Sequence, residues 1–375
     1  MSIFASLNLE LSKNWMFTFF ITAIVEMSVK LKYTELLKQA KQNLSDDYCP
    51  ISFFTPSPHQ WGADTIKCQF SRFGKGDKHY NHLLKDIDKL DYVRCAHIIN
   101  TFLLGKFLYE NCRSIEECVN DNIRRYVKNN FKKDFYFFWF LICLFHDLGY
   151  VEENKGKESD AFPNNLNQIN ILADVDGVPN LYKEVYLDYY NYRKFVFGVV
   201  DHGIFAGLKM YSNLCNIREE HARNNSDPKF WRKELEPIYN LASWVVLAHN
   251  IWFVKDTKRQ DCEIYRKYGL DKLVLETKTE MAEQKQTQVI VDYPIKIEEY
   301  PFLFLFCLVD LVEPMKKIGK MECCEKVGIN ITSRELTITS YLDCACGEQY
   351  LKQISEANDW LTKTKREGNI VTFNF

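Results

Sequence analysis

The chain has 375 residues, of which 46% are hydrophobic and 26% are charged, and these values are typical of a globular protein with a substantial core. They exclude a disordered, collagen-like or coiled-coil chain. Lys and Arg number 48 and Asp and Glu number 50, so the net charge is −2 and the composition carries no strong nucleic-acid signature. The length predicts two or three domains, or one large domain with insertions.

The N-terminal region, residues 1–89, is predicted to be helical or irregular. Its apolar run Trp15–Val25 ends at Glu26 and is roughly half as long as the ~20 residues that cross a bilayer. The run also lacks the positive start and the small-residue cleavage site of a signal peptide. We expect an apolar helix that docks on the protein body or on a partner, and membrane association is the less favoured alternative.

Five long apolar segments without strand-like alternation predict helices at residues 92–110, 135–148, 195–213, 238–253 and 300–317. Polar stretches near 151–180, 216–229 and 254–296 separate them and are typical of insertions. The last of these stretches contains short apolar pieces that would suit one more helix. We therefore predict a helical core over residues 90–320.

The last part of the chain, residues 321–375, has a different pattern. Glu335–Leu342 and Ile370–Phe375 alternate with β-branched residues, which predicts strands, and the helix-like segment Glu348–Leu361 lies between them. We predict a small α/β appendage here. The fold class is therefore mainly α, with a helical bundle, a helical N-terminal region and this appendage.

The 13 cysteines are an odd number with scattered spacing, and Cys95, Cys143 and Cys307 lie inside apolar runs, where cysteine acts as a small hydrophobic residue. This use of cysteine predicts a protein of the reducing cytoplasm rather than a secreted protein with a framework of disulfides. Cys323-Cys324 and Cys344-x-Cys346 lack the gap of about two to four residues that is usual in zinc sites. We therefore favour no structural zinc at either pair.

Six ionisable side chains interrupt the apolar helices: His97, His146, Asp147, His202, His249 and Asp310. Any one of the histidines alone is best explained as a core residue satisfied by hydrogen bonds. An unpaired buried carboxylate, however, costs several kcal/mol or becomes protonated. Two carboxylates with four histidines indicate a shared positive charge, and imidazole nitrogen with carboxylate oxygen suits Mn, Fe, Ni, Co or Zn, with Mg as a further alternative.

The order of these residues also carries a resemblance. His97 follows Arg94 by three residues, the pair His146-Asp147 ends an apolar helix in the sequence FHDLGY, and Asp310 lies in a later apolar helix. This arrangement resembles the HD superfamily of metal-dependent phosphohydrolases over about residues 90–317, which would make the core an HD-domain helical bundle. The subfamily stays unassigned.

The resemblance implies a ligand set for one or two divalent metals. His97, His146, Asp147 and Asp310 would hold the first metal, and Asp147 would bridge to a second one carried by His202 and His249. If one metal binds, the last two histidines become candidates for general acid or phosphate contact. Asp147 and His202 are the candidate catalytic residues.

The resemblance also implies an anionic substrate. Arg94 is similar to the arginine of the R-x-x-H signature, which contacts substrate phosphate in the nucleotide triphosphohydrolases of the superfamily. Lys209 follows His202, and Lys316 and Lys317 follow Asp310, by about two helical turns, so these lysines are further candidates to face the substrate. Among them we select Lys209 and Lys317, together with Arg94, as substrate-binding residues.

The implied activity is hydrolysis of a phosphate ester or anhydride by a metal-activated hydroxide. The substrate would be a nucleotide or another phosphorylated small molecule, as in nucleotidases, deoxynucleotide triphosphohydrolases and cyclic or oligonucleotide phosphodiesterases. The resemblance is also compatible with an oligomeric protein. Departures from the named subfamilies are Tyr150 and Val151 after the HD pair and Asn250 after His249. The particular substrate therefore stays open. The alternative is a catalytically weak or inactive HD module, metal-bound or metal-free, that binds a nucleotide as a sensor or signalling domain.

Overall fold

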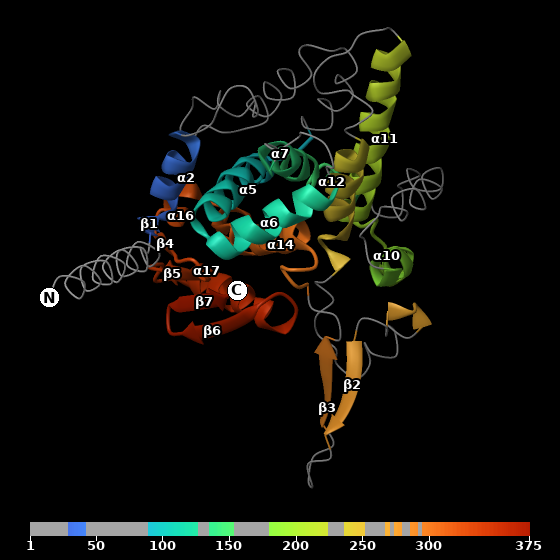
Figure 1. Ribbon diagram of the computed structural model, residues 1–375. Coiled ribbons are helices and arrows are strands. Elements are labelled where there is room, and N and C mark those ends of the chain that lie inside the picture. Colours follow the sequence, from blue (N-terminus) through green and yellow to red (C-terminus); the bar gives the residue numbers. More distant parts are fainter. Residues whose placement is uncertain are drawn as a thin grey trace, which may run out of the picture.

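The structure is a computed structural model that describes residues 29–42, 89–126, 135–153, 180–223, 236–251, 267–270, 274–279, 286–291 and 295–375. Within these ranges the protein is mainly helical and has a small antiparallel sheet at the C-terminus, which confirms that the fold is mainly α (Figure 1). No helix in this part of the chain is both long enough and apolar enough to cross a membrane. The apolar run Trp15–Val25 and most of the three polar stretches lie outside the described residues.

Four helices make up the centre of the helical core: α5 (Tyr92–Asn111), α7 (Phe135–Phe145), α12 (Glu236–Ala248) and α14 (Pro301–Val312). Helix α6 (Arg113–Tyr126) packs on α5 and α14, and α11 (His202–Arg223) packs along α12. Helix α14 is buried over its whole length, because its sequence PFLFLFCLVDLV offers no polar face to solvent. The one charged residue inside it is therefore buried too.

Aromatic packing brings α5 and α7 close together. Trp139 on α7 is fully buried, stacks on Phe135 and donates its indole N–H to the carbonyl oxygen of Phe102 at 2.9 Å. A Cβ on Gly105 would lie 2.0 Å from the indole ring, so α5 must carry glycine at this crossing. The resulting contact fixes the helix that carries His97 against α7, whose last residue directly precedes His146.

Two of the predicted helices are each divided in the structure. The segment 300–317 becomes α14 and α15 (Pro314–Ile318), because Pro314 has no N–H to continue the first helix and Glu313 caps the second. The segment 195–213 begins in a π-helix, η5 (Arg193–Phe197), which follows α10 (Asn180–Tyr192) and ends at Gly198 with φ 71°. Helix α11 then begins at His202, with the Asp201 carboxylate accepting the N–H of Ile204 at 3.1 Å.

The C-terminal sheet has the strand order β1-β4-β5-β7-β6 and is antiparallel throughout. Its strands are β1 (Val29–Lys32), β4 (Val327–Ile331), β5 (Glu335–Ser340), β6 (Lys363–Glu367) and β7 (Ile370–Asn374). The two strands predicted near the C-terminus correspond to β5 and β7. Helix α17 (Ala345–Ser355) contacts β6 and β7 as well as α14 and α15, so it joins the sheet to the helical core.

Two other strand regions differ from the sequence-based expectation. Strand β1 comes from the region predicted to be helical or irregular, because four residues are too few for a visible alternation and the strand exists by pairing with β4. The stretch 254–296 also contains an antiparallel pair that the sequence analysis did not predict, β2 (Val274–Thr279) and β3 (Gln286–Val291). The helix expected in this stretch stays a prediction, because residues 252–266 lie outside the described ranges. The division at residues 89/90 and 320/321 stays a prediction.

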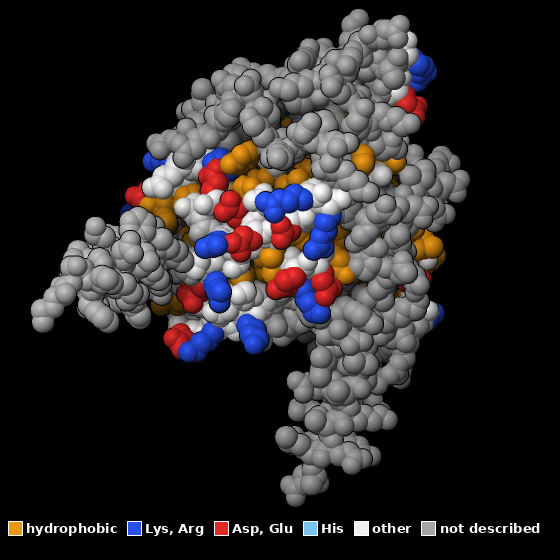
Figure 2. Space-filling view, viewed as in Figure 1, with side chains coloured by type: hydrophobic (Ala, Val, Ile, Leu, Met, Phe, Trp, Pro, Cys, Tyr) orange, Lys and Arg blue, Asp and Glu red, His pale blue; other side chains and the backbone are white. Residues whose placement is uncertain are grey.

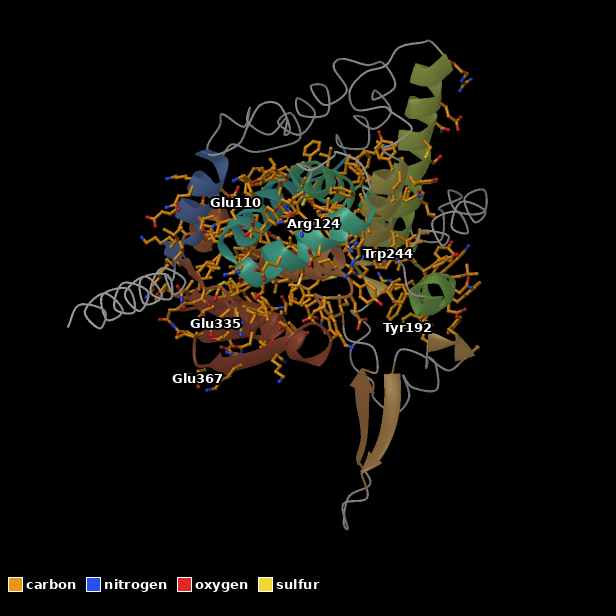
Figure 3. All side chains as sticks on the ribbon, viewed as in Figure 1. Glu110, Arg124, Tyr192, Trp244, Glu335 and Glu367 are labelled. Carbon is orange, nitrogen blue, oxygen red and sulfur yellow. A yellow bond between two sulfur atoms is a disulfide. The ribbon has the colours of Figure 1, made fainter. Side chains whose placement is uncertain are left out.

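Acidic and basic side chains alternate on the face of the molecule that α6 covers. Figure 2 shows both signs interspersed over the described part of this face. On α6 itself, Arg113 pairs with Glu117, and Arg124, which is labelled in Figure 3, pairs with Asp121, each at 2.7 Å. This helix therefore presents a mixed, solvated surface rather than a field of one sign.

Candidate metal centre

Three residues that are far apart in the chain meet inside the helical core. His97 lies on α5, His146 follows the last residue of α7, and Asp310 lies on α14. One ligand atom from each lies within 4.8 Å of the others, and all three residues are buried. The Nε2 atom of His97 is 2.9 Å from Oδ1 of Asp310, and Nε2 of His146 is 3.9 Å from the same oxygen. This buried group is able to bind a metal ion.

The pair His146-Asp147 is held in a turn that directs both side chains inward. His146 donates from Nδ1 to the carbonyl oxygen of Cys143 at 2.7 Å, and this bond points Nε2 toward the group. Oδ1 of Asp147 lies 3.2 Å from that Nε2. A Cβ on Gly149 would lie 1.9 Å from the carbonyl oxygen of His202, so glycine is required for α11 to approach the turn.

The four helix-borne imidazoles form a row. The ring centroids of His97 and His146 are 5.1 Å apart, those of His146 and His249 are 5.8 Å apart, and those of His249 and His202 are 5.3 Å apart. His249 follows α12 and donates from Nδ1 to the carbonyl oxygen of Val246 at 2.6 Å. The sequence-selected histidines therefore all lie in one region of the core, with His202 at the far end from His97.

Several buried atoms in this region have no hydrogen-bond partner among the described residues. They are Nε2 of His146, both carboxylate oxygens of Asp147, and Nε2 of His249. Buried polar groups in proteins are normally satisfied, because leaving one unpaired costs about 1–3 kcal/mol. Imidazole nitrogens and carboxylate oxygens are also donors that divalent transition metals accept. The residues present therefore fit a metal ion, whose identity the side chains leave undetermined.

His97 is oriented by a carboxylate that the sequence analysis did not select, Glu313. Oε2 of Glu313 lies 2.7 Å from Nδ1 of His97, on the side of the ring opposite Asp310. Glu313 also accepts hydrogen bonds from Tyr33 at 2.6 Å and from Asn100 at 3.0 Å. A carboxylate that fixes the second nitrogen of a histidine is a common support for metal ligands. The sequence feature by which Glu313 could have been found is its position: an acidic residue directly before Pro314, at the end of an apolar helix.

The environment drives the pKa values of the two central histidines in opposite directions. Burial opposes protonation of His97, but its hydrogen bonds to Asp310 and Glu313 outweigh burial and raise its pKa to about 9. Burial lowers the pKa of His146 to about 3, although the Asp147 carboxylate opposes this shift. His146 is therefore neutral at pH 7, and a metal ion on Nε2 of His97 would displace a proton.

His202 differs from His146 and His249 because both of its ring nitrogens are engaged. Nδ1 lies 2.7 Å from Oε2 of Glu153, and Nε2 lies 2.8 Å from Nδ2 of Asn250. The ring also stacks on Tyr150, with a centroid distance of 3.6 Å. These contacts hold the imidazole in a single orientation.

His202 contacts, through Glu153, an ion-pair cluster that the sequence analysis also missed. Arg193, in the π-helix, donates to Glu153 at 2.6 Å, and its Nε is 3.6 Å from Oδ2 of the buried Asp201. Burial raises the pKa of Glu153, and the charge of Arg193 opposes that shift. Glu153 follows Asp147 by six residues and Asp201 directly precedes His202, but their pairing through Arg193 depends on how α10 and η5 pack.

Arg94 lies at the solvent side of the group. Its side chain is 26% exposed, and Nη1 is 3.6 Å from Oδ2 of Asp147. Its guanidinium carbon lies 3.1 Å from the ring centroid of Tyr150. Because His202 stacks on the same ring at a similar distance, the two groups must occupy opposite faces of Tyr150.

The three lysines considered from the sequence have different surroundings. Nζ of Lys316 lies 2.8 and 3.1 Å from the two carboxylate oxygens of Asp310, because the turn at Glu313 brings α15 back toward α14. Lys317 is partly buried, and burial together with the charge of Lys316 lowers its pKa. Nζ of Lys209 lies 5.6 Å from the ring centroid of Phe205. Lys316 is thus the lysine for which the structure records contact with a site carboxylate.

No family model, curated protein or solved structure matches this chain. The resemblance to the HD superfamily is consequently a hypothesis that depends on the identity and order of a few residues.

Proposed function

We propose that the protein is a metal-dependent phosphohydrolase of the HD type that cleaves a phosphate ester or anhydride of a nucleotide. The observation that carries this proposal is the set of buried, unpartnered donor atoms on His146 and Asp147 beside His97 and Asp310. A purely structural core would have little reason to bury these atoms unsatisfied. Their position next to Arg94 and Lys316 supports an anionic substrate.

In this proposal His97, His146, Asp147 and Asp310 hold the metal ion. When bound, such an ion acidifies water and polarises a phosphoryl oxygen. Glu313 keeps the His97 ring in place, and the Nδ1 bond to Cys143 keeps Nε2 of His146 directed inward. The protein thus supplies rigid positioning, which is a large part of catalysis in phosphate chemistry.

The remaining roles fall to groups at the edge of the cluster. Arg94 binds a phosphate oxygen, since its guanidinium is partly exposed and is fixed in direction by the face of Tyr150. His202 holds a proton on Nδ1 against Glu153 and serves the leaving group or the attacking water through Nε2. That last role requires the Asn250 amide to move away from Nε2 when substrate binds.

The contact between Asn250 and His202 also favours a second candidate function. If Asn250 stays on Nε2, no proton can pass through His202, and the chain would bind a nucleotide without hydrolysing it quickly. The protein would then be a sensor or signalling module. Hydrolysis and binding have to be measured on the same sample to separate the two functions.

The test is a screen of nucleoside mono-, di-, tri- and cyclic phosphates with Mn or Mg, with the released phosphate species as the readout. We expect hydrolysis of at least one class and its loss in Asp147→Asn. Glu367→Gln, on the exposed β6 strand, is the matched acidic control and should retain full activity. Tight nucleotide binding without hydrolysis would support the sensor, and no bound metal in any preparation would contradict the hydrolase.

A further inference from the structure

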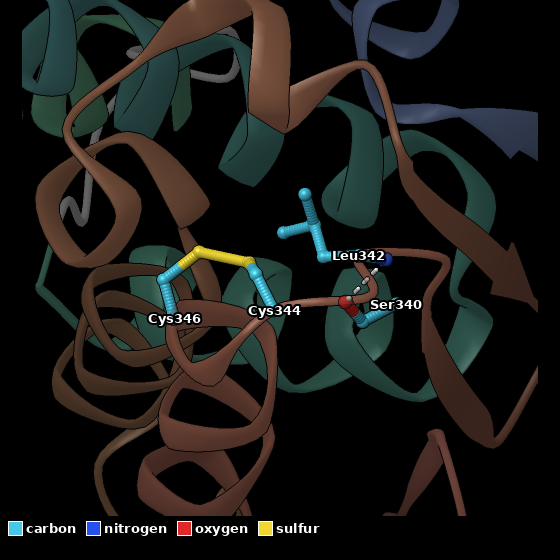
Figure 4. The surroundings of a disulfide bond; sticks show 4 residues. All are labelled: Ser340, Leu342, Cys344 and Cys346. Atoms are coloured by element: carbon cyan, nitrogen blue, oxygen red, sulfur yellow. Dashed lines mark hydrogen bonds between the residues drawn. A yellow bond between two sulfur atoms is a disulfide. The ribbon is translucent and has the colours of Figure 1, made fainter.

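A second chemical feature lies in the C-terminal appendage, away from the candidate metal centre. Cys344 and Cys346 form a disulfide bond across the single residue Ala345 (Figure 4). The described part of the chain holds eight further cysteines, and all of them are free thiols. One pair is therefore oxidised in a chain whose other described cysteines are reduced.

This bond has little to contribute as a structural crosslink. A disulfide stabilises a fold mainly by restricting the unfolded chain, and the effect decreases as the enclosed loop becomes shorter. The loop here contains one residue, so the restriction is close to the smallest that a disulfide can impose. The appendage is held instead by the pairing of its strands and by the buried side chains Tyr350, Leu351 and Ile354 of α17.

The bond is accessible to a reactant. Cys344 is exposed and Cys346 is half-buried, whereas the free cysteines Cys95 and Cys324 are fully buried. A surface depression adjoins Cys344 and is lined by residues that include Leu342, Asp343, Gly347 and Asn369. Exposed disulfides are the ones that react readily with thiols.

The start of α17 favours the thiolate that cleavage of the bond would release. Cys344 is the N-terminal cap of this eleven-residue helix, and its carbonyl oxygen accepts the N–H of Gly347 at 3.0 Å. Cys346 is the second residue of the helix, where the positive end of the helix dipole stabilises a negative sulfur. The nearby Glu348 is paired with Arg366 at 2.5 Å, and Asp343 adds one negative charge at this end.

We propose that Cys344 and Cys346 form a redox-active site that exchanges with external thiols. A donor thiolate attacks Sγ of Cys344, the bond to Sγ of Cys346 breaks, and the Cys346 thiolate leaves with the electron pair and takes up a proton. A second donor thiolate then attacks the mixed disulfide at the donor sulfur. The products are two cysteine thiols on the protein and one disulfide of the donor, so two electrons pass to the protein.

The test equilibrates the full-length protein, natively folded, with graded ratios of reduced to oxidised glutathione, and in a second arm with dithiothreitol. Free thiols are then alkylated and the peptide containing both cysteines is weighed by mass spectrometry. We expect a reversible gain of two alkyl groups as the buffer becomes more reducing, with an unchanged circular dichroism spectrum. Reduction by glutathione identifies a small monothiol as a sufficient donor, and reduction by the dithiol alone identifies a dithiol donor.

Single substitutions separate the two sulfurs. Cys346→Ser removes the leaving thiolate, so one glutathione should accumulate on Cys344. Cys344→Ser leaves only the half-buried Cys346, which should react roughly tenfold more slowly. Cys323→Ser is the control and should leave the titration of the pair unchanged, because Cys323 is a free thiol outside the bond. A pair that stays oxidised until the protein is denatured, or that is alkylated in every buffer, would overturn the proposal.

Discussion

The helical core and the C-terminal sheet bury very different side chains. Of the described residues, 15 polar or charged ones are buried, and Ser340 is the one that belongs to the sheet. The others include the row of histidines and the carboxylates Asp147, Asp310 and Glu313 in the helical part. The strands of the sheet instead alternate, as in β4, where Val327, Ile329 and Ile331 are buried and the residues between them are partly exposed.

This contrast indicates which region is organised for chemistry. Burying ionisable groups costs free energy that apolar residues of the same size would not require. The helical core accepts this cost where α5, α7, α12 and α14 meet and in the neighbouring cluster of Glu153, Arg193 and Asp201, whereas the sheet avoids it. Substitutions in the core cluster should therefore change ligand binding, while substitutions in the sheet should change stability alone.

The largest expected effect is the loss of metal on changing Asp147. Asp147→Asn removes a charge whose two oxygens are buried and unpartnered, so metal content should fall from stoichiometric to near zero. Metal analysis of the purified protein checks this, with Glu367→Gln on the sheet as the control. Equal metal in variant and control would refute the ligand role.

The next effect is on the stability of the core itself. Trp139→Ala removes a fully buried indole that stacks on Phe135 and bonds to Phe102, and should cost about 3–5 kcal/mol of unfolding free energy. Denaturant unfolding measures the loss. Trp139→Phe keeps most of the ring volume and should cost clearly less. A cost below about 1 kcal/mol for the alanine variant would mean that α7 does not pack on α5 as described.

A smaller effect is expected at Glu313, which contacts His97 and is not itself one of the proposed metal ligands. Glu313→Gln keeps the size of the side chain but loses its charge, and should weaken metal binding by about 10–100-fold. Competition with a chelator gives the affinity. Tyr33→Phe removes one of the hydrogen bonds to Glu313 and should weaken binding less. If both variants bound metal as tightly as the parent, His97 would not be a ligand supported by Glu313.

The smallest effect tests the connection between the two regions. Tyr350 on α17 donates its hydroxyl to the carbonyl oxygen of Val312 at 2.6 Å, next to Glu313. Tyr350→Phe leaves that buried carbonyl without this donor and should cost about 1–3 kcal/mol. Metal content should not change, because the ligands keep their own supports. A drop in metal content with little loss of stability would show instead that the appendage controls the centre.

Some helices and strands could be predicted from the sequence because the pattern of neighbouring residues is enough to determine them. The run FYFFWFLICLF is apolar on all sides, so a buried helix was expected there, and α7 has these bounds. The alternation of Glu335–Leu342 likewise predicted β5. Strand β1 and the pair β2–β3 escaped prediction, since a short strand depends on its partner more than on its own residues.

For the candidate site, the sequence by itself selected the histidines and aspartates that meet in the core, because such residues inside apolar helices stand out wherever they occur. Only the tertiary structure decided their partners: Glu313 on His97, Glu153 and Asn250 on His202, and Lys316 on Asp310. Local patterns report whether a residue is buried, but not what it faces. The facing group can come from a helix more than 200 residues away, as it does for His97 and Asp310, and its position is set by how the helices pack.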